Sequence, residues 1–465
     1  MGRVATELRR KSAYMATGLA ALLLRWLSPL EAAAAAAAAF VLCGVLAWVR
    51  GRRGGPIPGD GVRGGSAALL TYSLAVLGLI LVFRSRLELA AAAWALTAIG
   101  DGMATVAGLT LRGPRLPWNP AKTWWGFLGF VLYGTCSSAL LVRWVQHGRL
   151  DGGGAIGPSF LGFPSAPLWS DLTFLVLGCA GASVAAALAE SLDAGVDDSL
   201  LVAAVGGASI YAATLVEPAR LLAAWDLVQT ALPRGALAAG AVAAALLALR
   251  AARVPGAATV WIFGTLLWWL GGWRAFLLLA LSAAIAAACA RLGGCGAADD
   301  RPAGLGASAV AAQTASGAVA GVLFAFLAEA TPHRAAFVVA LVAALATTAA
   351  GSVASAFGRP GACRRFLLPT FRRAPAGDGG RVCVEGALAA VLAAAAIGGV
   401  AWGVSLAPAA GLWIAPAGAI VGLALEPALV SARRRSPSPG RELPGLVGIL
   451  AGALAAVALA SLARI

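Results

Sequence analysis

The sequence predicts an all-α fold, a polytopic transmembrane helical bundle in two membrane domains. Of the 465 residues, 60% are hydrophobic and only 12% are charged, and the mean hydropathy is +0.86. Apolar runs of about 20 residues, the length that a helix needs to cross a bilayer, recur along nearly the whole chain. Membrane lipid is therefore an expected partner of this chain.

Hydropathy predicts about 15 spans along the chain. In chain order they are expected at 12–29, 30–49, 66–83, 88–110, 125–145, 168–189, 200–217, 220–249, 255–273, 274–291, 305–329, 334–357, 385–405, 409–430 and 443–463. The connector at 250–255 is the expected boundary between domains 1–250 and 255–465. No cleavable signal pattern precedes the first span, which is expected to be retained.

Arginines cluster in the short connections between these runs, which predicts the topology. Cytoplasmic loops are enriched in Lys and Arg, so the loops at 112–124, 191–199 and 358–384 are expected in the cytoplasm, with the chain in the cell inner membrane. The turn at 84–86 is the exception, because the alternation of spans places it outside. The net charge of +15 follows from these loops, and no nucleic-acid partner is expected.

Cysteine and histidine offer little chemistry here. The seven cysteines form no C-x-x-C pair, and His147 and His333 are the two histidines. Neither disulfides nor a histidine-based zinc site are expected.

The stretch Gly100–Gly126 is the first candidate site. Asp101 ends a long apolar run, and a basic turn follows that contains Arg115, Asn119, Lys122 and Thr123. An acid and several cations could hold a phosphate chain and its Mg²⁺. The alternative is a polar loop that caps two membrane helices.

A second acidic cluster, Glu190 to Asp198, is expected on the same side of the membrane. It contains four acids within nine residues, namely Glu190, Asp193, Asp197 and Asp198. Two such clusters on one face could bind magnesium and a nucleoside triphosphate. Asp197 and Asp198 could instead cap the helix that begins at Ser199.

Three signatures in residues 1–250 resemble the polyprenol kinase family, which includes phytol, farnesol and dolichol kinases. The opening ELRRKSAY resembles E-x-x-R-K-x-x-H, with Tyr14 in place of the histidine. The Gly100–Gly126 stretch resembles the family's G-D-x-x-A…K-[ST]-x-x-G block. Residues 190–200 resemble E-S…D-D-N-L, with Ser199 in place of the asparagine. The resemblance implies a membrane kinase that transfers the γ-phosphate of CTP to a long-chain isoprenoid alcohol of the phytol, farnesol or geranylgeraniol type.

The same resemblance implies roles for individual residues. Asp101 would bind the metal or orient the hydroxyl, Asp197 and Asp198 would hold Mg²⁺, and Glu190 would support them. The phosphate and nucleotide contacts would come from Lys122, Arg115, Thr123, Asn119 and Gly126.

Residues 255–463 resemble the membrane family that contains the plant phytyl-phosphate kinase. The relevant pieces surround Gln313, Ala350–Gly358, 370–386 and Glu426. The candidate residues are Glu426, Asp378 and Ser355. Gly351 and Ala356 stand where that family has acids. This favours a degenerate domain that leaves an isoprenyl monophosphate unchanged. The alternative is a shifted metal site that uses Asp378, Glu385 and Glu426.

Two other functions compete with a kinase. A CTP-dependent cytidylyltransferase that makes a CDP-lipid would release pyrophosphate instead of CDP. A membrane transporter would be expected to place its acids near the midplane rather than at helix ends.

Overall fold

The computed structural model describes most of the chain. The described residues are 11–12, 14–52, 65–111, 113–116, 119–150, 172–191, 197–226, 228–249, 254–292, 304–357, 365–367, 372–373, 381–433 and 443–463. The chain divides into two compact units, Met1–Leu215 and Val216–Ile465, and each is described by itself.

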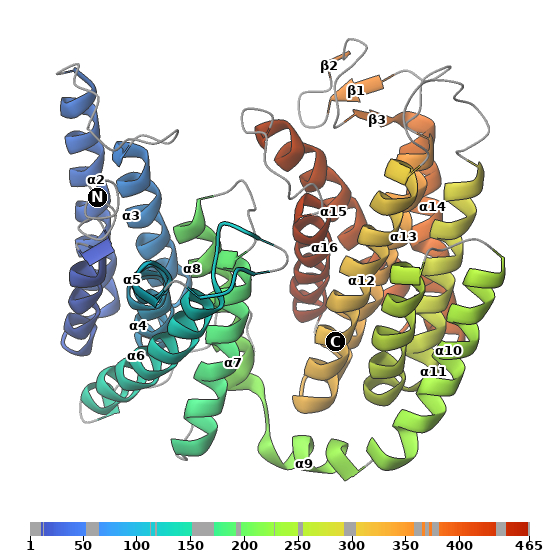
Figure 1. Cartoon of the computed structure of the whole chain (residues 1–465), viewed down its shortest axis with the longest axis horizontal. Helices are drawn as coiled ribbons and strands as arrows, with labels where there is room; N and C mark the ends of the chain where they lie inside the picture. Colours follow the sequence, from blue (N-terminus) through green and yellow to red (C-terminus); the bar gives the residue numbers. More distant parts are fainter. Residues whose placement is uncertain are drawn as a thin grey trace. The chain divides into compact units, whose positions relative to one another are not determined.

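The first unit is a bundle of helices (Figure 1). After the helical residues 14–18 come η1 (Leu19–Arg25), α2 (Pro29–Arg52), α3 (Gly65–Val82), α4 (Leu87–Ala95), the π-helical turn η2 (Leu96–Gly100), α5 (Asp101–Leu111), α6 (Trp124–Leu150), α7 (Leu172–Ser191) and α8 (Asp198–Leu215). The centre of this unit is α4, whose residues from Leu89 to Ala93 have no exposed surface. Its alanines let neighbouring helices approach closely, as small residues do between membrane helices.

The second unit is also helical, with one small sheet. Its helices are α9 (Pro218–Asp226), α10 (Val228–Ala248), α11 (Val254–Leu292), α12 (Gly304–Ala330), α13 (Arg334–Phe357), α14 (Val384–Gly403), α15 (Gly411–Arg433) and α16 (Leu443–Leu462). Three short antiparallel strands, β1 (Arg365–Leu367), β2 (Arg372–Arg373) and β3 (Arg381–Cys383), pair in the order β2-β1-β3. The central helix is α13, whose apolar membrane-length segment is entirely buried.

The boundary between the units lies earlier than the connector expected at 250–255. The Trp261 indole N–H in α11 donates to the Ala236 carbonyl in α10 at 3.0 Å. The Glu217 N–H donates to the Ala330 carbonyl at the end of α12 at 2.8 Å. Residues 216–249 therefore pack with the second unit, although a boundary at 250–255 would place them in the first.

Helix α11 is two helices joined at a sharp reversal. Gly272 has a φ of 71° and a ψ of −176°, outside the helical region. A Cβ placed on Gly264 would lie 3.0 Å from the Phe276 ring, whereas twelve residues of straight helix span about 18 Å. The separate segments expected at 255–273 and 274–291 are thus confirmed, and glycine is needed at the reversal because φ is positive.

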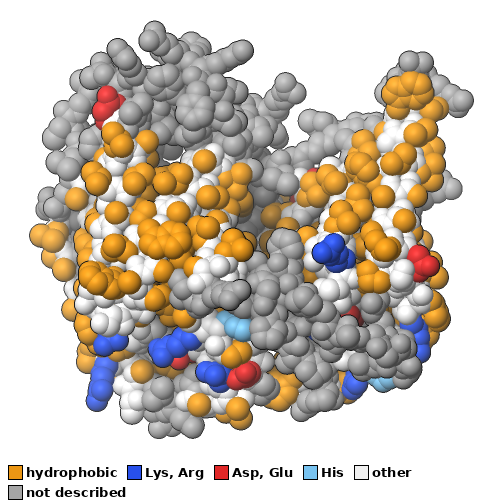
Figure 2. Space-filling model, turned by 180° about the vertical axis from the view of Figure 1, so that it is seen from behind, with side chains coloured by type: hydrophobic (Ala, Val, Ile, Leu, Met, Phe, Trp, Pro, Cys, Tyr) orange, Lys and Arg blue, Asp and Glu red, His pale blue; other side chains and the backbone are white. Residues whose placement is uncertain are grey.

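The described residues support a membrane bundle but not the expected number of spans. Ten helices are long and apolar enough to cross a membrane, and four shorter apolar helices accompany them. The count of about 15 spans is therefore not confirmed. Figure 2 shows apolar side chains over much of the outward helix surface, including exposed Leu, Val and Trp residues suited to lipid contact.

Candidate functional site

A π-helical turn directly before Asp101 sets the direction of its side chain. Residues Leu96–Gly100 form a π-helical turn, and the Asp101 N–H bonds to the Leu96 carbonyl, five residues back. Single π turns inside helices recur at functional sites because they change the direction of the following side chains. Asp101 is 4% exposed, so its carboxylate requires a partner within the protein.

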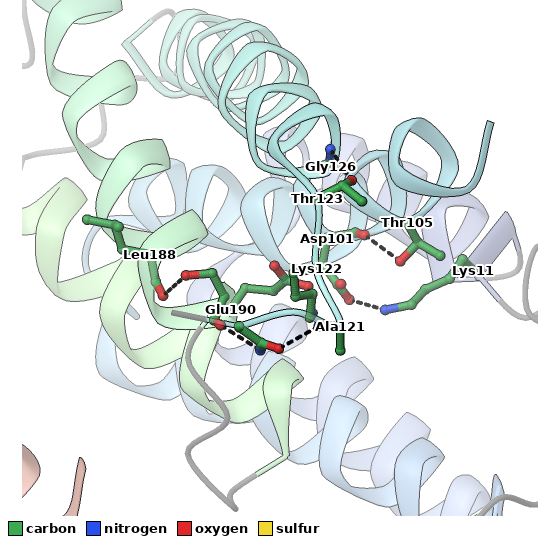
Figure 3. A network of polar contacts seen from close by, with 11 residues as sticks. Lys11, Asp101, Thr105, Ala121, Lys122, Thr123, Gly126, Leu188 and Glu190 are labelled. Atoms are coloured by element: carbon green, nitrogen blue, oxygen red, sulfur yellow. Dashed lines mark hydrogen bonds and ion pairs between the residues drawn. The ribbon is translucent and has the colours of Figure 1, made fainter. Parts of the chain in front are cut away.

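That partner is Lys11. Its ammonium nitrogen lies 2.5 Å from Oδ2 of Asp101 (Figure 3), and Lys11 itself is 8% exposed. The glycines that flank Asp101 allow this approach, because a Cβ on Gly102 would collide with Met15 of the N-terminal segment. A Cβ on Gly100 would collide with Phe130 of α6 in the same way.

A second ion pair joins Lys122 to Glu190 (Figure 3). Lys122 is carried by a short hairpin between α5 and α6, closed by bonds from the Leu116 N–H to the Lys122 carbonyl and from the Trp124 N–H to the Pro114 carbonyl, both 3.0 Å. Glu190, in the last turn of α7, is 6% exposed. The hairpin therefore holds a cation over a buried carboxylate.

Asn119 ties the same hairpin to the end of α7. Its side-chain amide donates to the Ser191 carbonyl at 2.9 Å, and its Oδ1 accepts from the Ala121 N–H at 3.0 Å. Asn119 thus holds Lys122 close to Glu190 rather than presenting a free amide to a nucleotide.

The two acids at the start of α8, Asp197 and Asp198, have different environments. Asp197 is the N-cap of the helix, since its Oδ1 accepts the Ser199 N–H at 3.0 Å. The capping alternative is confirmed for this residue. Asp198 interacts electrostatically with Lys122, Asp101 and Lys11, which places it in the same charged network.

Three other predicted site residues have structural contacts. Arg115 is exposed, and its Nη1 donates to the Pro120 carbonyl at 2.5 Å. Thr123 accepts the Gly126 N–H at 3.2 Å in the first turn of α6. A Cβ on Gly126 would lie 3.0 Å from the Ala104 carbonyl, so this glycine lets α6 cross α5 closely.

The carboxylates control the charge of Lys122. Burial lowers the pKa of Lys122, but the negative charges of Glu190, Asp198 and Asp101 outweigh it, so this pKa is raised above its ordinary value. The side chain remains one-third exposed. Lys122 is therefore a cation at physiological pH that an incoming anion can reach.

A preformed magnesium site does not fit these contacts. Carboxylates are suitable ligands for Mg²⁺, but among the described residues no three His, Cys, Asp or Glu side chains come close enough to hold a metal ion. The predicted set of Asp101, Asp197 and Asp198 is not assembled, because Asp101 is bound to Lys11 and Asp197 caps α8.

The second-unit candidates form no comparable network in the described residues. Glu426 lies on α15 beside the start of α16, since a Cβ on Gly445 would be 3.8 Å from its Oε1. Ser355 is on α13, and Asp378 lies outside the described residues. No ion pair in the part of the chain that the structure describes involves Glu426.

Lys11 is the site residue that the sequence interpretation missed. Its segment contributes to the sequence-based prediction only through the ELRRKSAY block, with no role assigned to Lys11. A simple count contains the signal: of 35 basic residues only two, Lys11 and Lys122, are lysines. Each of them is bound to a buried carboxylate of the same network.

Comparisons with known proteins agree on the membrane character of the chain. Residues 237–430 match the model of a family described as integral membrane protein DUF92. A protein of Synechocystis sp., described as an uncharacterized membrane protein, is 25% identical over 211 residues, which cover 44% of this chain and 81% of that protein. No solved structure matches the chain. The chain is an integral, multi-pass membrane protein.

Proposed function

We propose that this protein is an integral membrane kinase that transfers the γ-phosphate of CTP to a long-chain isoprenoid alcohol. The observation that carries the proposal is the meeting of three separate sequence blocks in one buried charged network. Lys11, Asp101, Lys122 and Glu190 come from those blocks, and the blocks are the ones that resemble polyprenol kinases. A loop that merely capped two helices would not need two lysines bound to buried carboxylates.

The ion pairs suit phosphate chemistry. A lysine ammonium is a compact charge on a flexible stem, so it can move from a carboxylate to a phosphate oxygen without a fixed geometry. A bound triphosphate would compete for Lys11 and Lys122, and Asp101 would then be free to accept a proton. Mg²⁺, if it accompanies the nucleotide, would neutralise phosphate charge.

The proposed transfer moves the γ-phosphoryl group from the nucleotide to the alcohol hydroxyl. The alcohol oxygen attacks the γ-phosphorus, its proton passes to the Asp101 carboxylate, and the bond from the γ-phosphorus to the β–γ bridging oxygen breaks. The products are the isoprenyl monophosphate and CDP. The hydroxyl would enter at the membrane interface while its chain stays among the helices in lipid, and the nucleotide would come from the cytoplasm.

For the second unit we propose no independent transfer. The positions at which the phytyl-phosphate kinase family has acids are Gly351 and Ala356 in this chain, and neither residue has a carboxylate. Purified protein given phytyl phosphate and a nucleotide should form little phytyl diphosphate. Diphosphate formation that Glu426→Gln stops would overturn this part of the proposal.

The deciding experiment gives purified protein CTP or ATP as the phosphate donor and phytol, farnesol or geranylgeraniol as the acceptor. The expected products are the monophosphate and CDP. Release of pyrophosphate would identify the cytidylyltransferase alternative. The absence of any product from all three alcohols with both nucleotides would contradict the kinase proposal.

A further inference from the structure

The N-terminal segment, Lys11 and residues 14–25, packs against the charged network. Its buried positions Lys11, Tyr14, Gly18, Ala21 and Leu24 recur every three or four residues, which is the spacing of one helix face. A Cβ on Gly18 would lie 2.7 Å from Ala98 in the π-helical turn. The segment therefore packs directly on the turn that aims Asp101, and its position determines whether Lys11 reaches that carboxylate.

Tyr72 of α3 connects this segment to the rest of the unit. Its hydroxyl oxygen is hydrogen-bonded to the Thr17 hydroxyl at 3.0 Å and accepts the Trp94 indole N–H of α4 at 2.9 Å. The Tyr72 ring stacks on Tyr14, with centroids 4.9 Å apart and planes 3° apart. One side chain, 6% exposed, thus joins the N-terminal segment, α3 and α4.

This connection is close to the reactive network in sequence and in space. Tyr14 lies one helical turn after Lys11, so fixing its ring limits where the Lys11 stem can start. Thr17 also donates to the Tyr14 carbonyl at 2.6 Å, which couples the Tyr72 contact to the same turn. Burying a lysine costs side-chain conformational entropy. When the backbone that carries Lys11 is already fixed, no further backbone entropy is lost as the ion pair forms.

We propose that Tyr72 is a positioning residue: it docks the N-terminal segment and thereby holds Lys11 on Asp101. The role in phosphate transfer rests on the proposed function, but the docking itself does not. Tyr72 touches neither the nucleotide nor the reacting hydroxyl in this assignment; it acts through Lys11.

The chain offers a direct measurement of docking, because Lys11 and Lys122 are its only lysines. Purified protein is treated with an amine-reactive ester, and labelling of each lysine is followed by mass spectrometry. Tyr72→Phe should raise the labelling rate of Lys11 roughly fivefold to tenfold, the size expected when the part-buried hydrogen bond to Thr17 is lost. Labelling of Lys122, on its own hairpin, should stay unchanged and serves as the internal control.

Tyr211→Phe is the matched variant. Tyr211 is a buried tyrosine of α8 whose ring lies 6.3 Å from Phe83, and it is expected to leave Lys11 protected. Equal labelling of Lys11 in the wild type and in Tyr72→Phe would overturn the proposal. Equal increases at both lysines, or the same increase in Tyr211→Phe, would indicate general loosening and overturn it as well.

Thr17 provides a second, independent test. Thr17→Val should expose Lys11 as Tyr72→Phe does, the double variant should add little more, and Thr17→Ser should restore protection. If the kinase activity is present, Tyr72→Phe should lower kcat more than it raises KM for CTP. If wild-type protein shows no transfer, the proposed function fails, whereas the labelling result still decides the docking role.

Discussion

The described residues of the two units differ in their buried charged side chains, although both units contain hydroxyls that bond back to carbonyls of their own helix. In the first unit, Asp101 and Glu190 are buried and each is bound to a lysine from a distant segment. In the second, the hydroxyls of Thr347 and Thr348 bond back to carbonyls of their own helix, α13, at 2.7 and 2.9 Å. Such local bonds satisfy a hydroxyl without requiring any other segment. The difference favours the first unit as the place of the proposed phosphate chemistry.

The largest expected effect on the rate of phosphate transfer comes from Asp101→Asn, with Glu426→Gln as its counterpart in the second unit. Removing the proposed base should lower the rate of phosphate transfer at least about a hundredfold, because the amide cannot accept the proton. Glu426→Gln makes the same chemical change in the second unit and should leave the rate within about twofold. Steady-state assays on purified variants check both, and a severe loss only in Glu426→Gln would reverse the comparison.

Lys122→Met sharpens the assignment within the first unit. Loss of a charged hydrogen bond to phosphate should reduce kcat/KM for CTP roughly 10- to 100-fold. Arg115→Met is the control, since the exposed Arg115 is bonded to its own hairpin at Pro120. It should have less than about a threefold effect. Equal losses in both variants would show that the hairpin, not Lys122 itself, is what matters.

Much of this arrangement could be predicted from sequence. Apolar runs located the helices, including the two halves of α11, and the motif blocks containing Asp101, Lys122 and Glu190 do meet in one network. Hydropathy could not assign 216–249 to a unit, because it reports burial in lipid and not which helices pack together.

Two features of the site were beyond such patterns. The π-helical turn before Asp101 has the composition Leu-Thr-Ala-Ile-Gly, which regular membrane helices also contain, so composition does not mark it. The Lys11–Asp101 pair joins positions 90 residues apart in sequence, and the packing of Tyr14, Met15 and Gly18 brings them together. Asn119 was expected to face a nucleotide, but the hairpin uses it to reach Ser191.

Helix packing offers a smaller test of the two units. A Cβ on Gly422 of α15 would lie 2.6 Å from the Gly448 carbonyl of α16, and one on Gly126 would lie 3.0 Å from the Ala104 carbonyl. Gly422→Ala should destabilise more than Gly126→Ala, each by about 1–3 kcal/mol, because backbone must move. Gly181→Ala is the control, since nothing lies within 4 Å of its Cβ position. Thermal unfolding in one detergent checks the order, which a loss in Gly181→Ala matching the other two would contradict.

The smallest expected effect is the alkaline dependence of stability that comes from Lys122. Its pKa is raised above the ordinary value of 10.5 by the nearby carboxylates, which outweigh burial. A raised folded-state pKa means that the folded protein holds this proton more tightly than the unfolded chain. The resulting stabilisation is fully present below pH 10.5 and is lost as the pH rises through the folded-state pKa.

Lys122→Met removes this titration, so its unfolding temperature should fall less than that of the wild type between about pH 9 and pH 11.5. The two proteins share every other ionisable side chain, so the difference between the two curves isolates Lys122. The wild type should therefore lose its advantage over the variant at the alkaline end. If the two curves fell in parallel, the carboxylates would not be holding a charged Lys122, and the electrostatic coupling of the hairpin to α7 and α8 would be wrong.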